Sequence, residues 1–153
     1  LGVGCFVPVI SARSVVRPAA ALLRKYGRWQ AIVREAAEQS GRSRLPVLME
    51  PVAWEAAIGQ AKGTRLLPWE TAHAGSPSLG TAVANAKKGA VAVAIGPEGG
   101  LTPEEVGDAT AAGWQVVTLG PRILRSETAA IAAATIVMER CGELSPQTAL
   151  PDS

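Results

Sequence analysis

The sequence has few charged residues, very few aromatic residues and no long hydrophobic run. Of its 153 residues, 18% are charged, 4% are aromatic and 48% are hydrophobic. Disordered and coiled-coil chains are much more charged and less apolar, so the composition argues against both classes. No apolar run approaches the roughly 20 residues of a membrane-spanning helix, so we expect no membrane segment. The length suits one domain with a sizeable core.

Cysteine and histidine are also scarce. Cys5 and Cys141 lie near opposite ends of the chain, in apolar surroundings and outside any C-x-x-C pair. We therefore expect reduced, buried, structural thiols, which favours a cytoplasmic location. The single histidine, His73, has no cysteine or carboxylate partner at ligand spacing, so we expect no metal site. The sequence contains neither a G-x-x-x-x-G-K-S/T phosphate loop nor a Ser-His-Asp arrangement.

Positive charge is concentrated in the N-terminal part of the chain. Residues 1–44 carry eight arginines and lysines against two glutamates, whereas the remaining residues carry seven basic and eleven acidic side chains. Arginine dominates the basic set, and its planar guanidinium suits phosphate better than a lysine does. The asymmetry fits a nucleic-acid face and equally fits a solvated helix surface, and charge alone leaves both open.

Apolar runs that alternate with helical patterns predict an α/β fold. We expect strands at 3–10, 47–52, 64–69, 90–95 and 114–119, with the run at 90–95 the most buried. Helices are expected at 18–39, with a possible break at Gly27, at 54–62, from a Thr102 cap to Gly113, and from a Ser126 cap to Cys141. This order predicts one domain at 1–144, built on a mostly parallel sheet with helices on both faces, and a loose tail at 145–153.

Two loops after expected strands contain the chemically unusual residues. In open α/β sheets, ligands bind beyond the carboxyl ends of the strands. The first loop, I-G-P-E-G-G-L at 95–101, places three glycines and the carboxylate of Glu98 after an apolar run. Glycine permits positive φ and lets a ligand approach backbone N–H groups. The loop is therefore either a ligand site or a tight turn between a strand and a helix.

The second loop, L-G-P-R-I-L-R-S-E-T at 119–128, places Arg122 and Arg125 just before a helix. Ile123 and Leu124 are apolar residues inside the same loop. They can form the wall of a purine-sized pocket while the arginines face a polyanion. Alternatively, ordinary burial of these two side chains fixes the loop and the arginines lie on the surface.

These loops and a third segment resemble the signature sequences of the RsmE family. The motifs are I-G-P-E-G-G-L-T-P-E-E-V at 95–106, L-G-P-R-I-L-R-S-E-T-A at 119–129 and R-W-Q-A-I-V-R-E-A-A-E-Q-S-G-R-S-R-L-P at 28–46. The segment R-S-V-V-R at 13–17 also agrees. Together the motifs extend over most of residues 1–142 in the family's order and spacing.

The resemblance implies a SPOUT-class methyltransferase, an α/β knot protein with a deep C-terminal trefoil knot. Members methylate N3 of one uridine in small-subunit 16S rRNA, use S-adenosylmethionine and act as homodimers. It thus implies an rRNA (uracil-N3) methyltransferase with S-adenosylmethionine as cofactor, and with 16S rRNA and a second copy of the chain as partners. Two other functions stay open: a SPOUT ribose 2′-O-methyltransferase acting on tRNA or rRNA, and a non-catalytic module that binds a nucleotide or RNA.

The resemblance also implies where the methyl donor binds. Carried over to matching positions, the cofactor-binding residues are Leu67, Trp69, Ile95, Gly96, Glu98, Gly99, Gly100, Leu119, Gly120, Ile123, Leu124, Arg125 and Thr128. The segment L-P-W-E at 67–70 would supply a third side of the donor site. The residue types agree with this placement. Glycines and backbone amides would bind the polar edges of the ligand, and apolar side chains would contact its adenine ring.

Uracil N3 carries a proton near neutral pH, so its methylation needs a general base. Glu98 or Glu127 is the candidate base, and Arg122 or Arg125 is the candidate to stabilise the uridine anion or to hold a phosphate. These alternatives stay open. The residues expected to hold the RNA backbone, or in part to cover a dimer surface, are Arg13, Arg17, Arg24 and Arg28.

The chain begins with Leu1 rather than methionine, and a segment is expected to precede it. RsmE proteins carry an N-terminal RNA-binding β-barrel of PUA type, followed by a helix that leads into the strand at 3–10. The resemblance therefore implies that residues 1–144 are the catalytic domain. On its own, this domain is expected to keep donor binding and to show weak or absent methylation.

Overall fold

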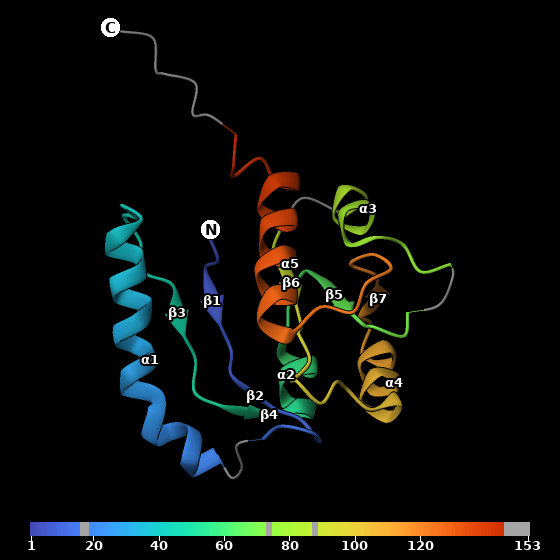
Figure 1. Ribbon diagram of the computed structural model, residues 1–153, viewed down its shortest axis with the longest axis horizontal. Coiled ribbons are helices and arrows are strands. Elements are labelled where there is room, and N and C mark those ends of the chain that lie inside the picture. The colour runs from blue at the N-terminus through green and yellow to red at the C-terminus, as the bar shows by residue number, and fades with distance from the viewer. Residues whose placement is uncertain (16–18, 73–74, 87–88, 146–153) are drawn as a thin grey trace, which may run out of the picture.

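The computed structural model describes residues 1–15, 19–72, 75–86 and 89–145. Strands and helices alternate along the chain (Figure 1): β1 Cys5–Phe6, β2 Val9–Ile10, α1 Ala19–Gln39, β3 Val47–Leu48, β4 Val52–Ala53, α2 Trp54–Gln60, β5 Thr64–Pro68, α3 Leu79–Ala84, β6 Val91–Val93, α4 Pro103–Ala111, β7 Gln115–Val117 and α5 Ser126–Arg140. The expectations for Arg17, for His73 and for the tail from residue 146 onward lie outside the described residues.

A three-stranded parallel sheet, in the order β6-β5-β7, lies at the centre of the fold. Leu66 of β5 packs into a cluster with side chains of α3 and α5, and Leu67 packs into another with side chains of α2 and α4. Both leucines are 0% exposed, because successive side chains of a strand point to opposite faces and helices cover both. The predicted α/β architecture, with parallel strands and helices on both faces, is confirmed for this sheet.

The prediction that 90–95 is the most buried strand is wrong. β6 is an edge strand of the sheet and its three residues are only half-buried, whereas β5 is central. The central strand β5 contains the charged residue Arg65, so its sequence is less apolar than that of β6. The Arg65 guanidinium donates a hydrogen bond to the carbonyl oxygen of Ala112, just after α4, at 2.8 Å.

The expected strands at 3–10 and 47–52 each form two short strands. β1 pairs with β3 and β2 pairs with β4, both in parallel. The register of the second pair is shifted by one residue, from Cys5 opposite Val47 to Val9 opposite Val52. Proline has no N–H to donate to a ladder, and Pro8 and Pro51 lie where the two ladders are interrupted.

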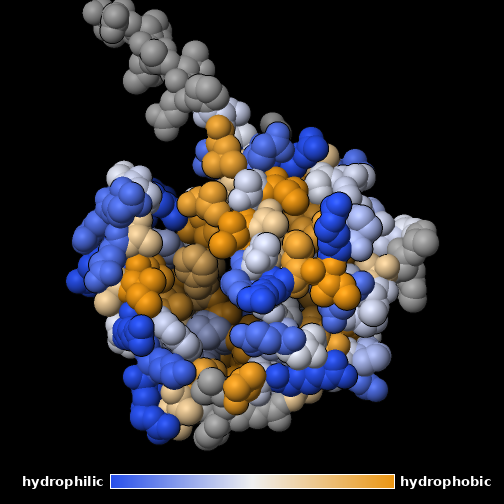
Figure 2. Space-filling model, in the orientation of Figure 1, coloured by the Kyte–Doolittle hydropathy of each residue, from blue (hydrophilic) through white to orange (hydrophobic). Residues whose placement is uncertain are grey.

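One face of β1 and β3 is apolar and exposed. Val7, Val47 and Met49 are each about half exposed, and Figure 2 shows hydrophobic side chains gathered between α1 and α5. Cys5 is exposed on β1 and Cys141 is exposed just after α5. The prediction of buried cysteines is therefore wrong, because apolar neighbours in sequence do not cover a side chain at an uncovered face or a helix end.

The helix ends agree with the sequence at α4 and differ at α5. Thr102 caps α4, and its hydroxyl oxygen and the carboxylate of Glu105 form a capping box. At α5 the N-cap is Arg125, which makes no side-chain cap hydrogen bond, so the prediction of a Ser126 cap is wrong. α1 continues through Gly27 without a break. Among the described helices, none has the length and hydropathy needed to cross a membrane.

Replacing Glu105 by alanine is expected to lower the free energy of unfolding by about 3 kcal/mol. This side chain is 7% exposed. Its two carboxylate oxygens accept hydrogen bonds from the backbone N–H groups of Ala12, at 2.6 Å, and of Thr102, at 2.9 Å. Alanine would leave both donors without this acceptor. Thermal unfolding measures the loss, and the neighbouring exposed variant Glu104→Ala is the control, with a smaller effect. Equal melting temperatures of the two variants would contradict the assignment.

Candidate active site

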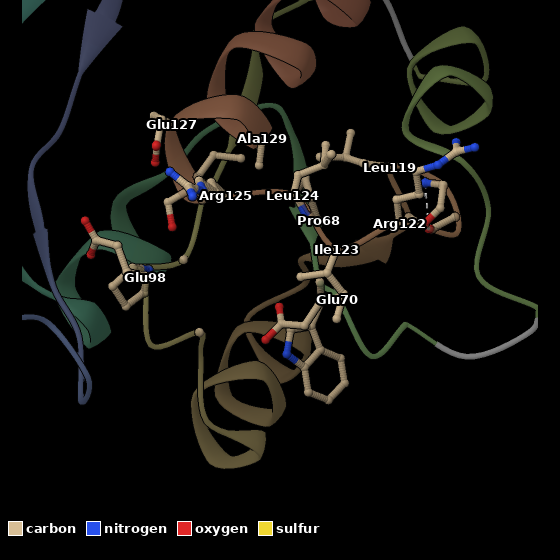
Figure 3. Close-up of a pocket in the computed structure, with 18 residues that line it drawn as sticks. Pro68, Glu70, Glu98, Leu119, Arg122, Ile123, Leu124, Arg125, Glu127 and Ala129 are labelled. Carbon is tan, nitrogen blue, oxygen red and sulfur yellow. Dashed lines mark hydrogen bonds between the residues drawn. The ribbon is translucent and has the colours of Figure 1, made fainter.

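Three loops meet at a cavity of about 470 Å³ at the carboxyl ends of the central strands. Because β5, β6 and β7 are parallel, their carboxyl ends lie at one edge of the sheet. The end of β5 and the loop after it contribute residues 68–70, and the loop after β6 contributes residues between 95 and 100. The loop after β7 contributes residues between 118 and 125, and the first turn of α5 contributes residues between 126 and 129. Figure 3 shows side chains from all three loops around the cavity.

The glycine loop after β6 forms a tight turn at the edge of this cavity. The N–H of Gly100 donates to the carbonyl oxygen of Pro97 at 2.9 Å, and Gly100 has a φ of +70°. A side chain at residue 100 would also meet Glu70, since a Cβ placed there lies 2.5 Å from the Glu70 Oε1. The positive φ therefore favours glycine at this position, and a larger residue there would displace the Glu70 carboxylate.

The loop after β7 is hydrogen-bonded at its start to the first residue of α3. The Thr118 hydroxyl accepts a hydrogen bond from the N–H of Gly120 at 3.0 Å, and the carbonyl oxygen of Thr118 accepts from Leu79 N–H at 3.0 Å. Gly120 has a φ of +110°, which favours glycine. Beyond it, Leu124 is half-buried while Ile123 is 81% exposed, and both line the cavity. Ile123 and Leu124 are therefore available to a ligand, whereas Leu119 of the same loop packs against the core cluster of α3 and α5.

Charged side chains lie at two ends of the cavity. Glu98, Arg125 and Glu127 lie near one end, and Arg122 lies at the other, beside Leu119 (Figure 3). All four charged residues are exposed and line the cavity. Within the described part of the chain, the one ion pair joins Arg140 and Glu139, away from the cavity. The guanidinium of Arg125 is thus free to bind an anion.

Most of the predicted cofactor residues come together here. Ten of the thirteen line the cavity: Trp69, Ile95, Gly96, Glu98, Gly100, Leu119, Gly120, Ile123, Leu124 and Arg125. The four candidate catalytic residues, Glu98, Arg122, Arg125 and Glu127, line it as well. The two loops singled out in the sequence therefore form one site.

Three predicted cofactor residues do not line the cavity. Leu67 is wholly buried in the core beneath α2 and α4, because it alternates with Leu66 across β5. Gly99 lies against Arg13 on another side of its loop. Thr128, in the first turn of α5, is exposed and outside the cavity lining.

Six further residues line the cavity, and two of them, Pro68 and Glu70, belong to the segment 67–70 that the resemblance places beside the methyl donor. The six are Pro68, Glu70, Pro97, Thr118, Ser126 and Ala129. Glu70 is the chemically important one, since it adds a third carboxylate to the cavity. Like Glu98, it lies just after a strand of the sheet.

The arginines predicted to hold RNA lie in different places. Arg24 and Arg28 are exposed on α1. Arg13 donates through its Nη1 to the carbonyl oxygen of Gly99 at 3.0 Å, at the glycine loop. Hydrogen bonds from the backbone N–H of Glu104 and from the Thr102 hydroxyl, together with the positive charge of Arg13, lower the pKa of the Glu104 carboxyl. Arg13 therefore lies against the glycine loop and the start of α4 rather than on the basic surface of α1.

A search of the described residues finds no group of three histidine, cysteine, aspartate or glutamate side chains that could hold a metal ion. The cavity instead offers carboxylates, guanidiniums, glycine backbone and apolar side chains. Its volume falls in the range of pockets that enclose small-molecule ligands. This chemistry suits an organic ligand with both apolar and charged parts.

Comparison with known proteins gives consistent matches. Residues 1–138 match the family model described as an RNA methyltransferase domain. Two relatives carry the name ribosomal RNA small subunit methyltransferase E. The one from Synechocystis sp. (strain ATCC 27184 / PCC 6803 / Kazusa) is 38% identical over 131 residues, covering 84% of this chain and 42% of the relative. The one from Bacillus subtilis (strain 168) is 34% identical over 143 residues, covering 90% and 56%.

Solved structures are also similar. A ribosomal RNA small subunit methyltransferase E from Neisseria gonorrhoeae, bound to S-adenosyl methionine, is 36% identical with a TM-score of 0.72 and covers 92% of this chain and 55% of that chain. A structure from Legionella pneumophila with the bound cofactor SAM is 33% identical with a TM-score of 0.79, covering 90% and 56%. This chain spans about half the length of the curated relatives it matches.

Proposed function

The chain belongs to the RNA methyltransferase domain family, and on this premise we propose that it methylates N3 of a uridine in 16S rRNA of the small ribosomal subunit, with S-adenosylmethionine as methyl donor. The observation that carries the proposal is the cavity formed by the loops after β5, β6 and β7. It combines apolar side chains, glycine backbone, carboxylates and guanidiniums in one place, and relatives of the same fold bind S-adenosyl methionine.

The residues of the cavity fit this donor. S-adenosylmethionine, when bound, supplies an electrophilic methyl group on a sulfonium sulfur. Leu119, Ile123 and Leu124 offer apolar surface for an adenine ring, and the glycine loop lets a ligand come close to backbone amides. Carboxylates such as Glu70 and Glu98 offer acceptors for hydroxyl or amino groups.

The charged end of the cavity is suited to the uridine. Methylation forms the N3–CH₃ bond and breaks the sulfur–CH₃ bond, and the N3 proton must pass to a base. Glu98 and Glu127 lie near the same end as Arg125 (Figure 3), so either carboxylate can accept that proton. The Arg125 guanidinium stabilises the negative charge that develops on the base ring as the proton leaves. The uridine must be unpaired or flipped to reach this cavity.

The proposal extends to the parts that surround the cavity. The chain would be a SPOUT domain with a trefoil knot at its C-terminal part, and would act as a homodimer in the cytoplasm, where ribosomal RNA is found. Residues 1–144 would be its catalytic domain, preceded by an RNA-binding domain of PUA type. The relatives' greater length supports the added domain. The exposed apolar face of β1 and β3 supports a further covering element or copy.

Saturating S-adenosylmethionine is expected to raise the melting temperature by about 5–10 °C, because binding to the folded state alone at 100 times Kd adds about 2.7 kcal/mol. Leu124→Glu is expected to remove this shift, since it puts a charge on the apolar wall of the cavity. Leu23→Glu on α1, at an exposed leucine away from the cavity, is the matched control and should keep the shift. Calorimetry checks both results.

The reaction itself is tested by mass spectrometry of nucleosides from small-subunit RNA incubated with the protein in excess. The expected product is N3-methyluridine. A ribose-methylated nucleoside would instead support a 2′-O-methyltransferase. Donor binding to the folded protein is required by the proposal, and its absence in calorimetry would overturn the cofactor assignment.

A further inference from the structure

The segment that precedes α1 reaches the glycine loop from a distant part of the sequence. Residues 11–14 form a turn in which the Ser14 N–H donates to the carbonyl oxygen of Ser11 at 3.2 Å. Arg13 lies in this turn, and its Nη1 donates to the carbonyl oxygen of Gly99 at 3.0 Å, although 86 residues separate the two. The glycine loop is therefore contacted, at Gly99 and outside the cavity lining, by a segment that neither signature loop supplies.

The turn that carries Arg13 is itself anchored. The N–H of Ala12, the residue before Arg13, donates to the buried carboxylate of Glu105 at 2.6 Å. Glu105 also closes the capping box at the start of α4, the helix that follows the glycine loop. The position of Arg13 is thus fixed relative to Gly99 in the middle of the glycine loop and to Thr102 at its end.

The backbone of the glycine loop at Gly99 also lies close to Arg13. A Cβ placed on Gly99 would lie 3.1 Å from the Cβ of Arg13 and 3.5 Å from its carbonyl oxygen. On the other side, a Cβ placed on Gly100 would lie 2.5 Å from the Glu70 Oε1. The Gly99–Gly100 pair is therefore held between the turn that carries Arg13 and the loop after β5.

We propose that Arg13 is a positioning residue that fixes the glycine loop in the conformation that receives the methyl donor. This role rests on the proposed function and goes beyond it, because it assigns to Arg13 a task other than contact with RNA. Two adjacent glycines have more conformational freedom than any other pair of residues, so ordering them during binding would cost affinity. A loop that is ordered beforehand avoids that cost.

The hydrogen bond suits this task. An ionised donor makes a stronger bond to a carbonyl oxygen than a neutral one does. Arginine also keeps its charge at every physiological pH, and its stem is long enough to reach Gly99 from a separate turn. The bond to Gly99 involves one guanidinium nitrogen, Nη1, and Arg13 as a whole is exposed.

The experiment compares Arg13→Ala, Arg13→Lys and, as a matched control at an exposed arginine of α1, Arg24→Ala. Calorimetry with S-adenosylmethionine is expected to show about tenfold weaker binding for Arg13→Ala, which corresponds to about 1.4 kcal/mol. Arg13→Lys should recover part of the affinity, because its ammonium can still donate to the Gly99 carbonyl. Arg24→Ala should bind as the unsubstituted protein does.

Hydrogen exchange in the ligand-free protein separates positioning from a general loss of structure. In Arg13→Ala, peptides that cover residues 95–101 should exchange several-fold faster, while those of α5 keep their protection. Unchanged donor affinity, or loop exchange no faster than in Arg24→Ala, would overturn the role. If Arg13 only contacted RNA, Arg13→Ala would weaken RNA binding and leave donor affinity and loop exchange unchanged.

The two proposals fail in different ways. If the unsubstituted protein did not bind S-adenosylmethionine, the proposed function would fail. Loop exchange, measured without any ligand, would still show whether Arg13 holds the glycine loop. If the unsubstituted protein binds the donor and Arg13→Ala binds it equally well, only the role of Arg13 is lost.

Discussion

Replacing Arg125 by alanine is expected to reduce methyl transfer to small-subunit RNA by about 10²–10³, the usual effect of removing one group that stabilises a developing anion. Arg125 lies near the same end of the cavity as Glu98 and Glu127 (Figure 3). Its guanidinium can face the pyrimidine ring as N3 loses its proton. The donor should still bind with an affinity within a few-fold of normal, since the apolar wall and the glycine loop stay intact.

Arg122→Ala is the matched control for this prediction. Both arginines are exposed, lie in the same loop and line the same cavity, but Arg122 lies at the opposite end. The Arg122→Ala substitution should lower the rate of methyl transfer by less than tenfold. Single-turnover rates with protein in excess of RNA measure both variants without a limit from RNA affinity. Unchanged transfer by Arg125→Ala would remove it from the reaction, and equal losses would indicate a general attraction for RNA.

The cavity follows from local features of the sequence more directly than the packing around it does. Both signature loops carry local signals, namely glycines after a strand and a capping box at Thr102, and these depend on a few neighbouring residues. Because parallel strands end at one edge, placing two loops after two strands was enough to bring them together. Local signals and one topological rule thus account for the cavity.

The parts that were missed depend on contacts between distant segments. The central position of β5 follows from its neighbours on both sides, and Arg65 conceals it in the sequence. The exposure of Cys5 follows from which face of β1 is covered. The bond from Arg13 to Gly99 joins residues 86 positions apart. Such contacts have no periodicity along the chain, so pattern reasoning cannot find them.

Replacing Gly63 by alanine is expected to be the most destabilising single change at a glycine of this fold. Gly63 has a φ of +78°, and a Cβ placed on it would lie 2.0 Å from the carbonyl oxygen of Ala90. That oxygen accepts a hydrogen bond from the Thr64 N–H at 2.9 Å, at the start of the β5–β6 ladder. Because the obstacle is backbone that already takes part in the sheet, no side-chain rotation relieves it.

The expected loss for Gly63→Ala is about 4 kcal/mol or more, which combines left-handed strain with displacement of the ladder. The melting temperature should fall by roughly 10 °C. Gly59→Ala is the matched control, because Gly59 lies inside α2 with open space around its Cβ position. There alanine should stabilise the helix by up to about 1 kcal/mol. Similar melting temperatures for the two variants would contradict the assignment. Since β5 and β6 lead into two of the three loops around the cavity, Gly63→Ala should also weaken donor binding in whatever fraction still folds.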